Sequence, residues 1–169
     1  MKLQQREIYL AGPITGLSYG EARHGWREEF DAILYKMGPA FRHIKCRSPM
    51  RAKQHLETLE EIGATGDQPE YDHFISKGRA IVERDRNDVR TSDAVVFNFL
   101  GASVASVGSC IEIGWADAFR VPTVLIIEDY ARILKNPHEH LMVDGICGYR
   151  VNNLQDAAFA VANMLTPGI

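Results

Sequence analysis

The chain has 169 residues, of which 46% are hydrophobic and 24% charged, and its formal net charge is −3. This length and composition are typical of one globular domain with a sizeable core, so we expect a single domain over residues 1–169. The slightly acidic balance argues against a nucleic-acid surface, which would carry a strongly basic stripe. No apolar run reaches the ~18 residues of a membrane span, and the apolar stretch near the N-terminus is too short for a signal peptide.

The three cysteines are odd in number and widely spaced, at Cys46, Cys110 and Cys147. They match neither a disulfide framework nor a CxxC metal site. A reducing, cytoplasmic location is therefore the simplest interpretation.

The beginning of the chain predicts two strands with a helix between them. Residues 8–11 form an apolar run that ends at Gly12-Pro13, as is typical of a buried strand. Over residues 21–37, apolar residues recur at spacings of three and four, which predicts a helix. Gly38-Pro39 ends this helix, and a second strand is expected within residues 41–46.

The rest of the chain begins with a long loop and then alternates between helices and strands. Residues 52–70 are polar and aperiodic, and we expect a surface loop or lid, because loops of this length are usually functional or disordered. We expect helices over 71–90, 108–120, 131–134 and 154–165, and strands over 94–100, 122–127 and 146–151. This alternation predicts an α/β fold, a flavodoxin- or Rossmann-like doubly wound sandwich with a mainly parallel five-stranded sheet.

One carboxylate, Glu112, falls in the first turn of the helix expected over 108–120. That turn follows a strand, and α/β sheets bind ligands in the crevice at the carboxyl ends of their strands. Gly108 and Ser109 would let a ligand approach the backbone closely, which favours a catalytic role. The alternative is structural, because Ser109-x-x-Glu112 matches a capping box in which the glutamate bonds back to the serine amide. Spacing alone does not decide between the two.

The turn Gly12-Pro-Ile-Thr-Gly16 follows the first strand. Its backbone amides could cradle a phosphate, which makes Gly12, Pro13 and Ile14 candidate substrate-binding residues. The turn is neither a GxGxxG motif nor a Walker A loop, so a simple strand-ending turn is the alternative.

Three aspartates, Asp85, Asp88 and Asp93, lie just before the strand expected over 94–100. If one of them joins Glu112 in the crevice, the two carboxyl groups could divide the roles of nucleophile and acid. The alternative is a solvated helix face followed by a turn.

His138 and His140 are a weak signal for a metal, because no carboxylate cluster lies nearby in the sequence. We therefore expect no metal site.

Taken together, these residues resemble the nucleoside 2-deoxyribosyltransferase family. The most specific likeness is the pattern Gly108-Ser-x-x-Glu112-Ile-Gly-x-Ala116. The other matching segments are Ile8-Tyr-Leu-Ala-Gly-Pro13, Arg47-Ser-Pro-Met-Arg51, and Asp85 placed eight residues before Asp93. The resemblance covers most of the chain, and the loop over 52–70 fits it less well.

The resemblance implies an enzyme that cleaves the N-glycosidic bond of a 2′-deoxynucleoside or its 5′-monophosphate and transfers the sugar to another base or to water. Glu112 matches the family's nucleophile, which would form a covalent deoxyribosyl intermediate as in retaining glycoside hydrolysis. Tyr9 matches the tyrosine that orients this glutamate. Asp85 matches an acidic residue that contacts or protonates the departing base.

One departure from the transferase pattern bears on the substrate. Six residues before the nucleophile, transferases of free nucleosides typically carry an Asp that binds the 5′-hydroxyl, whereas this chain has Ser106. The related 2′-deoxynucleoside 5′-monophosphate N-hydrolases carry a Ser there. A carboxylate would repel a phosphate, while a hydroxyl and the amides at a helix N-terminus can donate to it. We therefore expect Ser106, Gly108 and Ser109 to form a phosphate cup, with Arg47, Arg51 or His24 as possible sources of positive charge.

The resemblance also implies a homodimer or higher homo-oligomer, because a neighbouring subunit completes the active site in this family. No metal or organic cofactor is required, since side chains supply both nucleophile and acid. Two alternatives stay open: a strict 5′-monophosphate N-hydrolase, and a nucleotide-binding sensor without turnover, because a fold does not fix a function. A sensor, however, has no need of Glu112, Tyr9 and Asp85 together.

Overall fold

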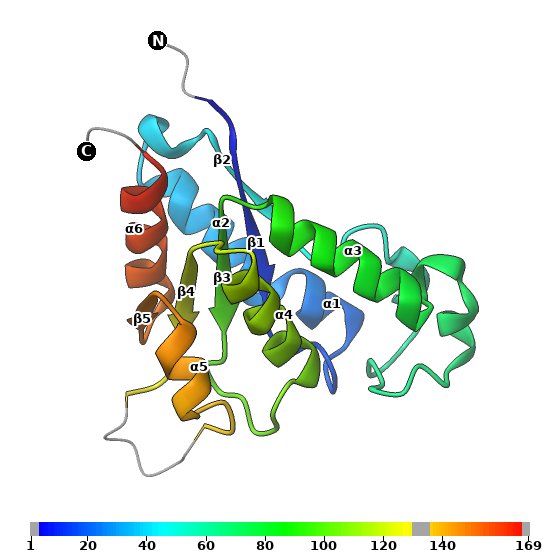
Figure 1. Ribbon diagram of the computed structural model, residues 1–169. Helices are drawn as coiled ribbons and strands as arrows, with labels where there is room; N and C mark the ends of the chain where they lie inside the picture. The colour runs from blue at the N-terminus through cyan, green and yellow to red at the C-terminus, as the bar shows by residue number, and fades with distance from the viewer. Residues whose placement is uncertain (1–3, 130–135, 167–169) are drawn as a thin grey trace.

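The structure is a computed structural model that describes residues 4–129 and 136–166. Five strands form one sheet in the order β2-β1-β3-β4-β5, and every neighbouring pair is parallel (Figure 1). The strands are β1 (Arg6–Ala11), β2 (Ile44–Arg47), β3 (Ala94–Asn98), β4 (Thr123–Ile126) and β5 (Tyr149–Val151). The expected α/β fold with a parallel five-stranded sheet is thereby confirmed.

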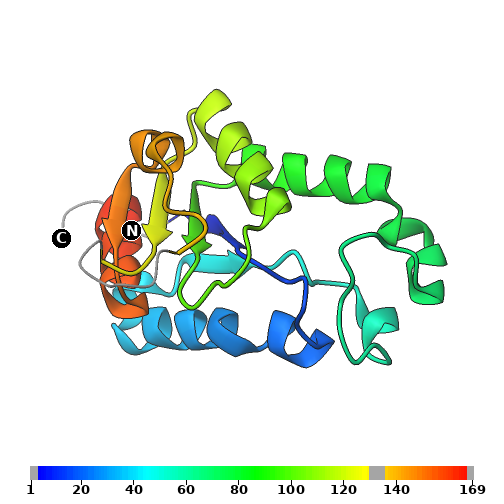
Figure 2. The ribbon, with the colours of Figure 1, turned by 90° about the horizontal axis from the view of Figure 1, so that it is seen from below.

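Helices cover both faces of this sheet, α2 and α6 on one side and α3, α4 and α5 on the other (Figure 2). The helices are α1 (Tyr19–Arg23), α2 (Gly25–Lys36), α3 (Gly78–Thr91), α4 (Val107–Ala118), α5 (Leu141–Ile146) and α6 (Leu154–Leu165). Four short 3₁₀ helices are η1 (Pro39–Phe41), η2 (Gln54–Leu56), η3 (Pro69–Asp72) and η4 (Phe74–Ser76). Across the described residues, no helix combines the length and the apolar character that a bilayer crossing needs.

Side chains alternate along the strands into two hydrophobic cores. On β1, Ile8 and Leu10 pack with α2 and α6, whereas Tyr9 and Ala11 point to the side of α3 and α4. Both faces of a parallel sheet are covered by helices, which explains why its strands are apolar along their whole length.

The amino ends of β1 and β3 are joined by Asp93. Its carboxylate accepts hydrogen bonds from Arg6 Nη1 at 2.7 Å and from the backbone amide of Glu7 at 2.8 Å. Its own amide donates to the Glu7 carbonyl at 2.7 Å. Asp93 is thus a structural residue at the edge of the sheet opposite the strand-end crevice.

The helix expected over 21–37 is two helices, which is a correction to the sequence prediction. Helix α1 begins early because Ser18 and Glu21 form a capping box. His24 ends α1 and precedes α2. The following strand, β2, begins later than expected because Pro39 opens the 3₁₀ helix η1 instead.

The helix expected over 71–90 begins only at Gly78, and Pro69 opens η3 upstream of it. Phe74, in the predicted helix, is 76% exposed. Helix α5 was not predicted, and it takes the first residue of the strand expected over 146–151. The helix expected over 131–134 lies outside the described residues.

The segment 52–70 packs onto the body of the protein through a small third core. Its buried Leu56 and Ile62 contact residues of α1 and of the loop after β2 in a cluster completed by Tyr19, Ala22, Met50 and Tyr71. The Gly16 amide donates to the Ile62 carbonyl at 3.0 Å, and the Ile62 amide donates to the Leu17 carbonyl at 2.8 Å. The segment therefore forms an ordered cover beside the turn that follows β1.

Candidate active site

The strand order places a topological switch point between β1 and β3. From β1 the chain crosses to β2 on one side, and β3 lies on the other, which is the arrangement that opens a ligand crevice at the carboxyl ends. Gly12, which follows β1, approaches β3 so closely that a Cβ atom there would lie 2.7 Å from the Asn98 carbonyl oxygen. A side chain at position 12 would push the two strand ends apart.

Tyr9 and Glu112 meet in this crevice from β1 and α4. The Tyr9 hydroxyl donates a hydrogen bond to Glu112 Oε1 at 2.8 Å. Glu112 is only 8% exposed, and burial, followed by the negative charge of Asp85, raises its pKa to about 8. The Tyr9 hydrogen bond and the charge of Arg27 act in the opposite direction. Burial also raises the pKa of Tyr9 well above its usual value, so this hydroxyl stays a donor.

The capping-box interpretation of Glu112 is wrong. Helix α4 begins at Val107, and its N-cap is Ser106, whose hydroxyl accepts from the Ser109 amide at 3.3 Å. Glu112 therefore lies in the second turn, too far along the helix to bond back to the cap. Its buried carboxylate is held by Tyr9 instead.

Asp85 is the aspartate that joins Glu112. It is 8% exposed on α3, and burial raises its pKa, against the charges of Arg84 and Lys53. Arg84 Nε donates to Asp85 Oδ1 at 2.8 Å. The structure therefore brings together Glu112, Tyr9 and Asp85, the three side chains selected from the sequence.

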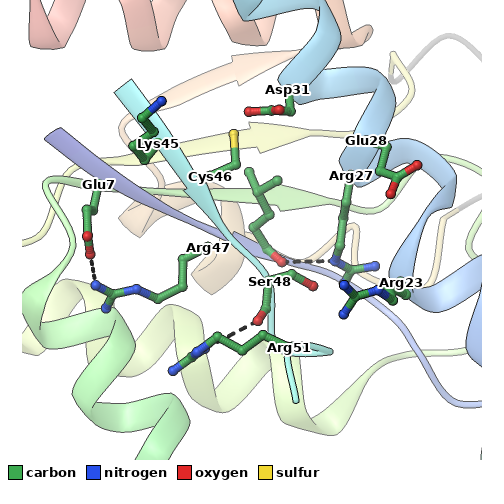
Figure 3. A pocket seen from close by; sticks show the side chains of 11 residues that line it. Glu7, Arg23, Arg27, Glu28, Asp31, Lys45, Cys46, Arg47, Ser48 and Arg51 are labelled. Carbon is green, nitrogen blue, oxygen red and sulfur yellow. Dashed lines mark hydrogen bonds and ion pairs between the residues drawn. The ribbon is translucent and has the colours of Figure 1, made fainter. Parts of the chain in front are cut away.

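Asp88 has a different role from Asp85. It accepts two hydrogen bonds from Arg51, at 2.5 and 2.7 Å, and one from Arg47 at 3.2 Å. Arg47 also pairs with Glu7 (Figure 3). These arginines thereby hold the loop after β2 against α3. His24 bonds to Glu28 on the exposed side of α2.

Arg27 is a buried cation that the sequence interpretation missed. Only 3% of its surface is exposed. Its guanidinium donates to the carbonyl oxygens of Leu10, Gly12 and Ala22 at 3.2, 3.3 and 2.8 Å. Burial lowers its pKa to about 10. The available signal was its spacing, three residues before buried Phe30, which puts a cation within the apolar stripe of α2.

A surface pocket of about 360 Å³ lies along β2 and α2 (Figure 3). Four arginines line it, among them Arg27, which reaches from this pocket to the end of β1. Glu112, Tyr9 and Asp85 are not among its lining residues. Arg27 connects the pocket with the carboxylate site, because it lines the pocket and its charge acts on Glu112.

The expected phosphate-cup residues lie at the start of α4. Ser106 is half-buried, Gly108 is exposed, and Ser109 is buried. The Ser106 hydroxyl also donates to Ser109 Oγ at 3.0 Å. On the other side of the crevice, Pro13 and Ile14 are half-buried in the turn after β1.

His138, considered from sequence as a metal ligand, fastens the loop in front of α4. Its ring stacks on Phe99 with 3.7 Å between the centroids. Its Nε2 accepts a hydrogen bond from the Ser106 amide at 2.7 Å. In the part of the chain that the structure describes, no three His, Cys, Asp or Glu side chains group as metal ligands would.

Comparison with known proteins supports the same family. The family model for nucleoside 2-deoxyribosyltransferase matches residues 8–157. A comparison with curated proteins gives no match.

Several solved structures share the fold. A 2-deoxyribosyltransferase from Bacillus psychrosaccharolyticus is 17% identical with a TM-score of 0.57, and the match covers 92% of this chain and 95% of that one. The CMP N-glycosidase BcmB of Clostridium botulinum is 13% identical with a TM-score of 0.53, covering 95% and 100%. A 2-deoxyribosyltransferase from Leishmania mexicana is 16% identical with a TM-score of 0.53, covering 92% and 95%. With the family model matching most of its length, the chain belongs to the nucleoside 2-deoxyribosyltransferase family.

Proposed function

We propose that this protein cleaves the N-glycosidic bond of 2′-deoxynucleoside 5′-monophosphates or 2′-deoxynucleosides, with Glu112 as the nucleophile. The observation that carries the proposal is the buried hydrogen bond of 2.8 Å between Tyr9 and Glu112 at the strand-end crevice. A carboxylate held in one orientation at this position suits attack on an anomeric carbon.

The reaction would proceed in two steps. Glu112 attacks C1′, the C1′–N bond breaks, and a covalent deoxyribosyl ester forms through an oxocarbenium-like transition state. Water or a second base then attacks C1′ and releases the carboxylate. The Tyr9 hydroxyl orients the nucleophile and stabilises its charged form, and we assign Asp85 to contact with the departing base.

The start of α4 supports a preference for 5′-monophosphates and makes a strict N-hydrolase the second candidate. Ser106 and Ser109 place two hydroxyls at the N-terminus of a 12-residue helix, where the helix dipole favours an anion. An Asp at position 106 would add a negative charge there. A phosphate bound by these hydroxyls and by the nearby amides would fix the sugar relative to Glu112.

Glu112→Gln tests the proposed nucleophile. We expect the rate of base release, measured by chromatography, to fall by roughly 10³-fold or more. Glutamine keeps the shape of the side chain but removes the nucleophilic carboxylate. Glu29→Gln, an exposed change on α2, is the matched control and should keep full activity. Acid quenching followed by peptide mass spectrometry should find a deoxyribosyl adduct on Glu112 in the wild type. Full activity of Glu112→Gln would exclude this nucleophile.

The same assay separates the candidate reactions. Each deoxynucleoside and its 5′-monophosphate would be incubated with and without a free acceptor base. Base release from monophosphates alone, without exchange, identifies an N-hydrolase, and exchange on free nucleosides identifies a transferase. A sensor would bind these compounds and release no base.

A further inference from the structure

A buried lysine, Lys53, shares the crevice with the two carboxyl groups. Only 3% of it is exposed, and its charge interacts with those of both Asp85 and Glu112. Among the described residues, none makes a hydrogen bond or close ion pair with its ammonium, and its nitrogen is not one of the fully enclosed atoms that lack a partner. The ammonium is therefore desolvated yet open to a ligand, a state that costs free energy unless something uses it.

Two structural features place this lysine near Asp85: the bonds of Arg51 with Asp88 and the backbone conformation of Ala52. Arg51, two residues before Lys53, donates hydrogen bonds from both of its terminal nitrogens to the Asp88 carboxylate. Asp88 lies about one helical turn beyond Asp85, on the same side of α3. Between the two basic residues, Ala52 adopts a left-handed backbone conformation with φ of 58°. Such a conformation is unfavourable for an alanine by on the order of 1 kcal/mol, and strain of this kind concentrates at functional sites.

We propose that Lys53 is the general acid that protonates the departing base, a role that rests on the glycosidic cleavage proposed above. As the C1′–N bond breaks, its electron pair passes to the base, the Lys53 ammonium transfers a proton to that base, and Glu112 forms the ester with C1′. In the second step the neutral amine takes a proton from the attacking water or acceptor base while the ester bond to Glu112 breaks. The ammonium and the carboxylate are thereby both restored.

The charges around Lys53 suit this task. Burial, followed by the charge of Arg84, lowers its pKa to about 8; Arg51 acts in the same direction, and Asp85 and Glu112 act against it. This pKa is close to neutral pH, where a general acid is most effective. Asp85 already accepts a hydrogen bond from Arg84, and its charge favours the protonated form of Lys53, so we assign to it stabilisation of the ammonium and contact with the base. An anionic purine or pyrimidine is a poor leaving group, so protonation of the base should accelerate cleavage of the C1′–N bond strongly.

Lys53→Met and Lys53→Arg, assayed on two substrates, test the proposal. Methionine keeps the length of the side chain without a buried charge, a replacement that proteins commonly tolerate. Arginine keeps the charge but does not release its proton. One substrate is a deoxynucleoside 5′-monophosphate, and the other is 4-nitrophenyl 2-deoxyriboside 5-phosphate, whose leaving group departs without protonation.

We expect both variants to lose roughly 10²- to 10⁴-fold in kcat for base release and to lose less than about tenfold on the nitrophenyl substrate. Equal losses on both substrates would mean a structural role and overturn the proposal. Near-wild-type base release by Lys53→Arg would mean that only the charge matters and would also overturn it.

The wild-type pH profile supplies a second test that needs no variant to fold. Base release should decline at high pH as Lys53 loses its proton, and nitrophenol release should show no such decline. Identical profiles on the two substrates would exclude the role of Lys53. The outcome is separable from the proposed function, because Glu112→Gln alone decides whether the glycosidic bond is cleaved through this site.

Discussion

Glu112 is held between opposing electrostatic effects. Burial and Asp85 raise its pKa to about 8, while Tyr9 and Arg27 favour the ionised form. At pH 7 roughly one tenth of a group with such a pKa is ionised. In the reaction proposed above only the carboxylate attacks C1′, so the rate of the first step should rise with pH up to about 8. Above that pH the loss of the Lys53 proton opposes the rise.

Tyr9→Phe should shift that dependence. The hydroxyl donates to the carboxylate, so its removal raises the pKa of Glu112 further and moves the rising limb of kcat/KM to higher pH. At pH 7 we expect roughly a ten- to hundredfold loss, the equivalent of one charge-assisted hydrogen bond. Tyr35→Phe, on the exposed side of α2, is the control. A Tyr9→Phe profile that coincides with the wild type would show that the hydroxyl does not tune Glu112.

The candidate site could be predicted where residues match the family pattern. Glu112 was selected because it follows a predicted strand, and the family pattern identified Tyr9 and Asp85. Lys53 lies in an aperiodic segment, and only tertiary contacts, such as that of Arg51 with Asp88, bring it to the site. No periodicity in the sequence encodes such a contact.

At the scale of single elements, the first turn of α4 is held in place by His138, a residue distant in sequence. The Ser106 amide can only donate, so His138 Nε2 accepts, and Nδ1 bonds with Asn136 Oδ1 at 3.1 Å. Asn136 donates in turn to the Phe99 carbonyl at 2.5 Å. A neutral histidine thus links the end of β3 to the start of α4, and burial, which lowers its pKa, keeps it neutral.

His138→Phe should keep the stack on Phe99 and remove the acceptor. Leaving the Ser106 amide without its partner should reduce the free energy of unfolding by about 1 kcal/mol, measured by urea denaturation. KM for a 5′-monophosphate should rise several-fold more than kcat falls, because the loop that carries Ser106 loosens. His138→Gln, which offers an amide oxygen, should restore part of this loss. An unchanged KM in His138→Phe would separate His138 from substrate binding.

Among the helices that the structure describes, the long ones were predicted and the short ones were not. Helix α6 occupies the predicted residues because its apolar stripe is regular. Helix α5 is six residues long, too short for a periodic pattern to show. The start of α3 was misplaced because Phe74 extends the apolar pattern in the sequence while its side chain is exposed.

For the molecule as a whole, α4 presents an apolar stripe beside the site. Val107 is 73% exposed, and Ile111 and Phe119 follow at helical spacing with 47% and 39%. Trp115, between them, is half-buried under the guanidinium of Arg86. The resemblance described in the sequence analysis implies a homo-oligomer, and we propose that a second copy of the chain packs on this stripe.

Ile111→Arg should weaken that association. A charge at the centre of an apolar contact is desolvated without a partner, so analytical ultracentrifugation should show the wild type as a dimer or larger assembly and the variant shifted towards monomer. Phe159→Arg, on the exposed side of α6, should leave the assembly unchanged. A wild type that sediments as a monomer at micromolar concentration would exclude the interface.

The bond network of Asp93 has a consequence for engineering. It secures the amino ends of β1 and β3, whereas Tyr9, Gly12 and Glu112 lie towards the carboxyl ends. In a parallel sheet these two ends are separated by the full length of the strands. A mutant library confined to the amino ends of the strands could therefore be selected for thermal tolerance without changing the residues of the candidate site at the carboxyl ends.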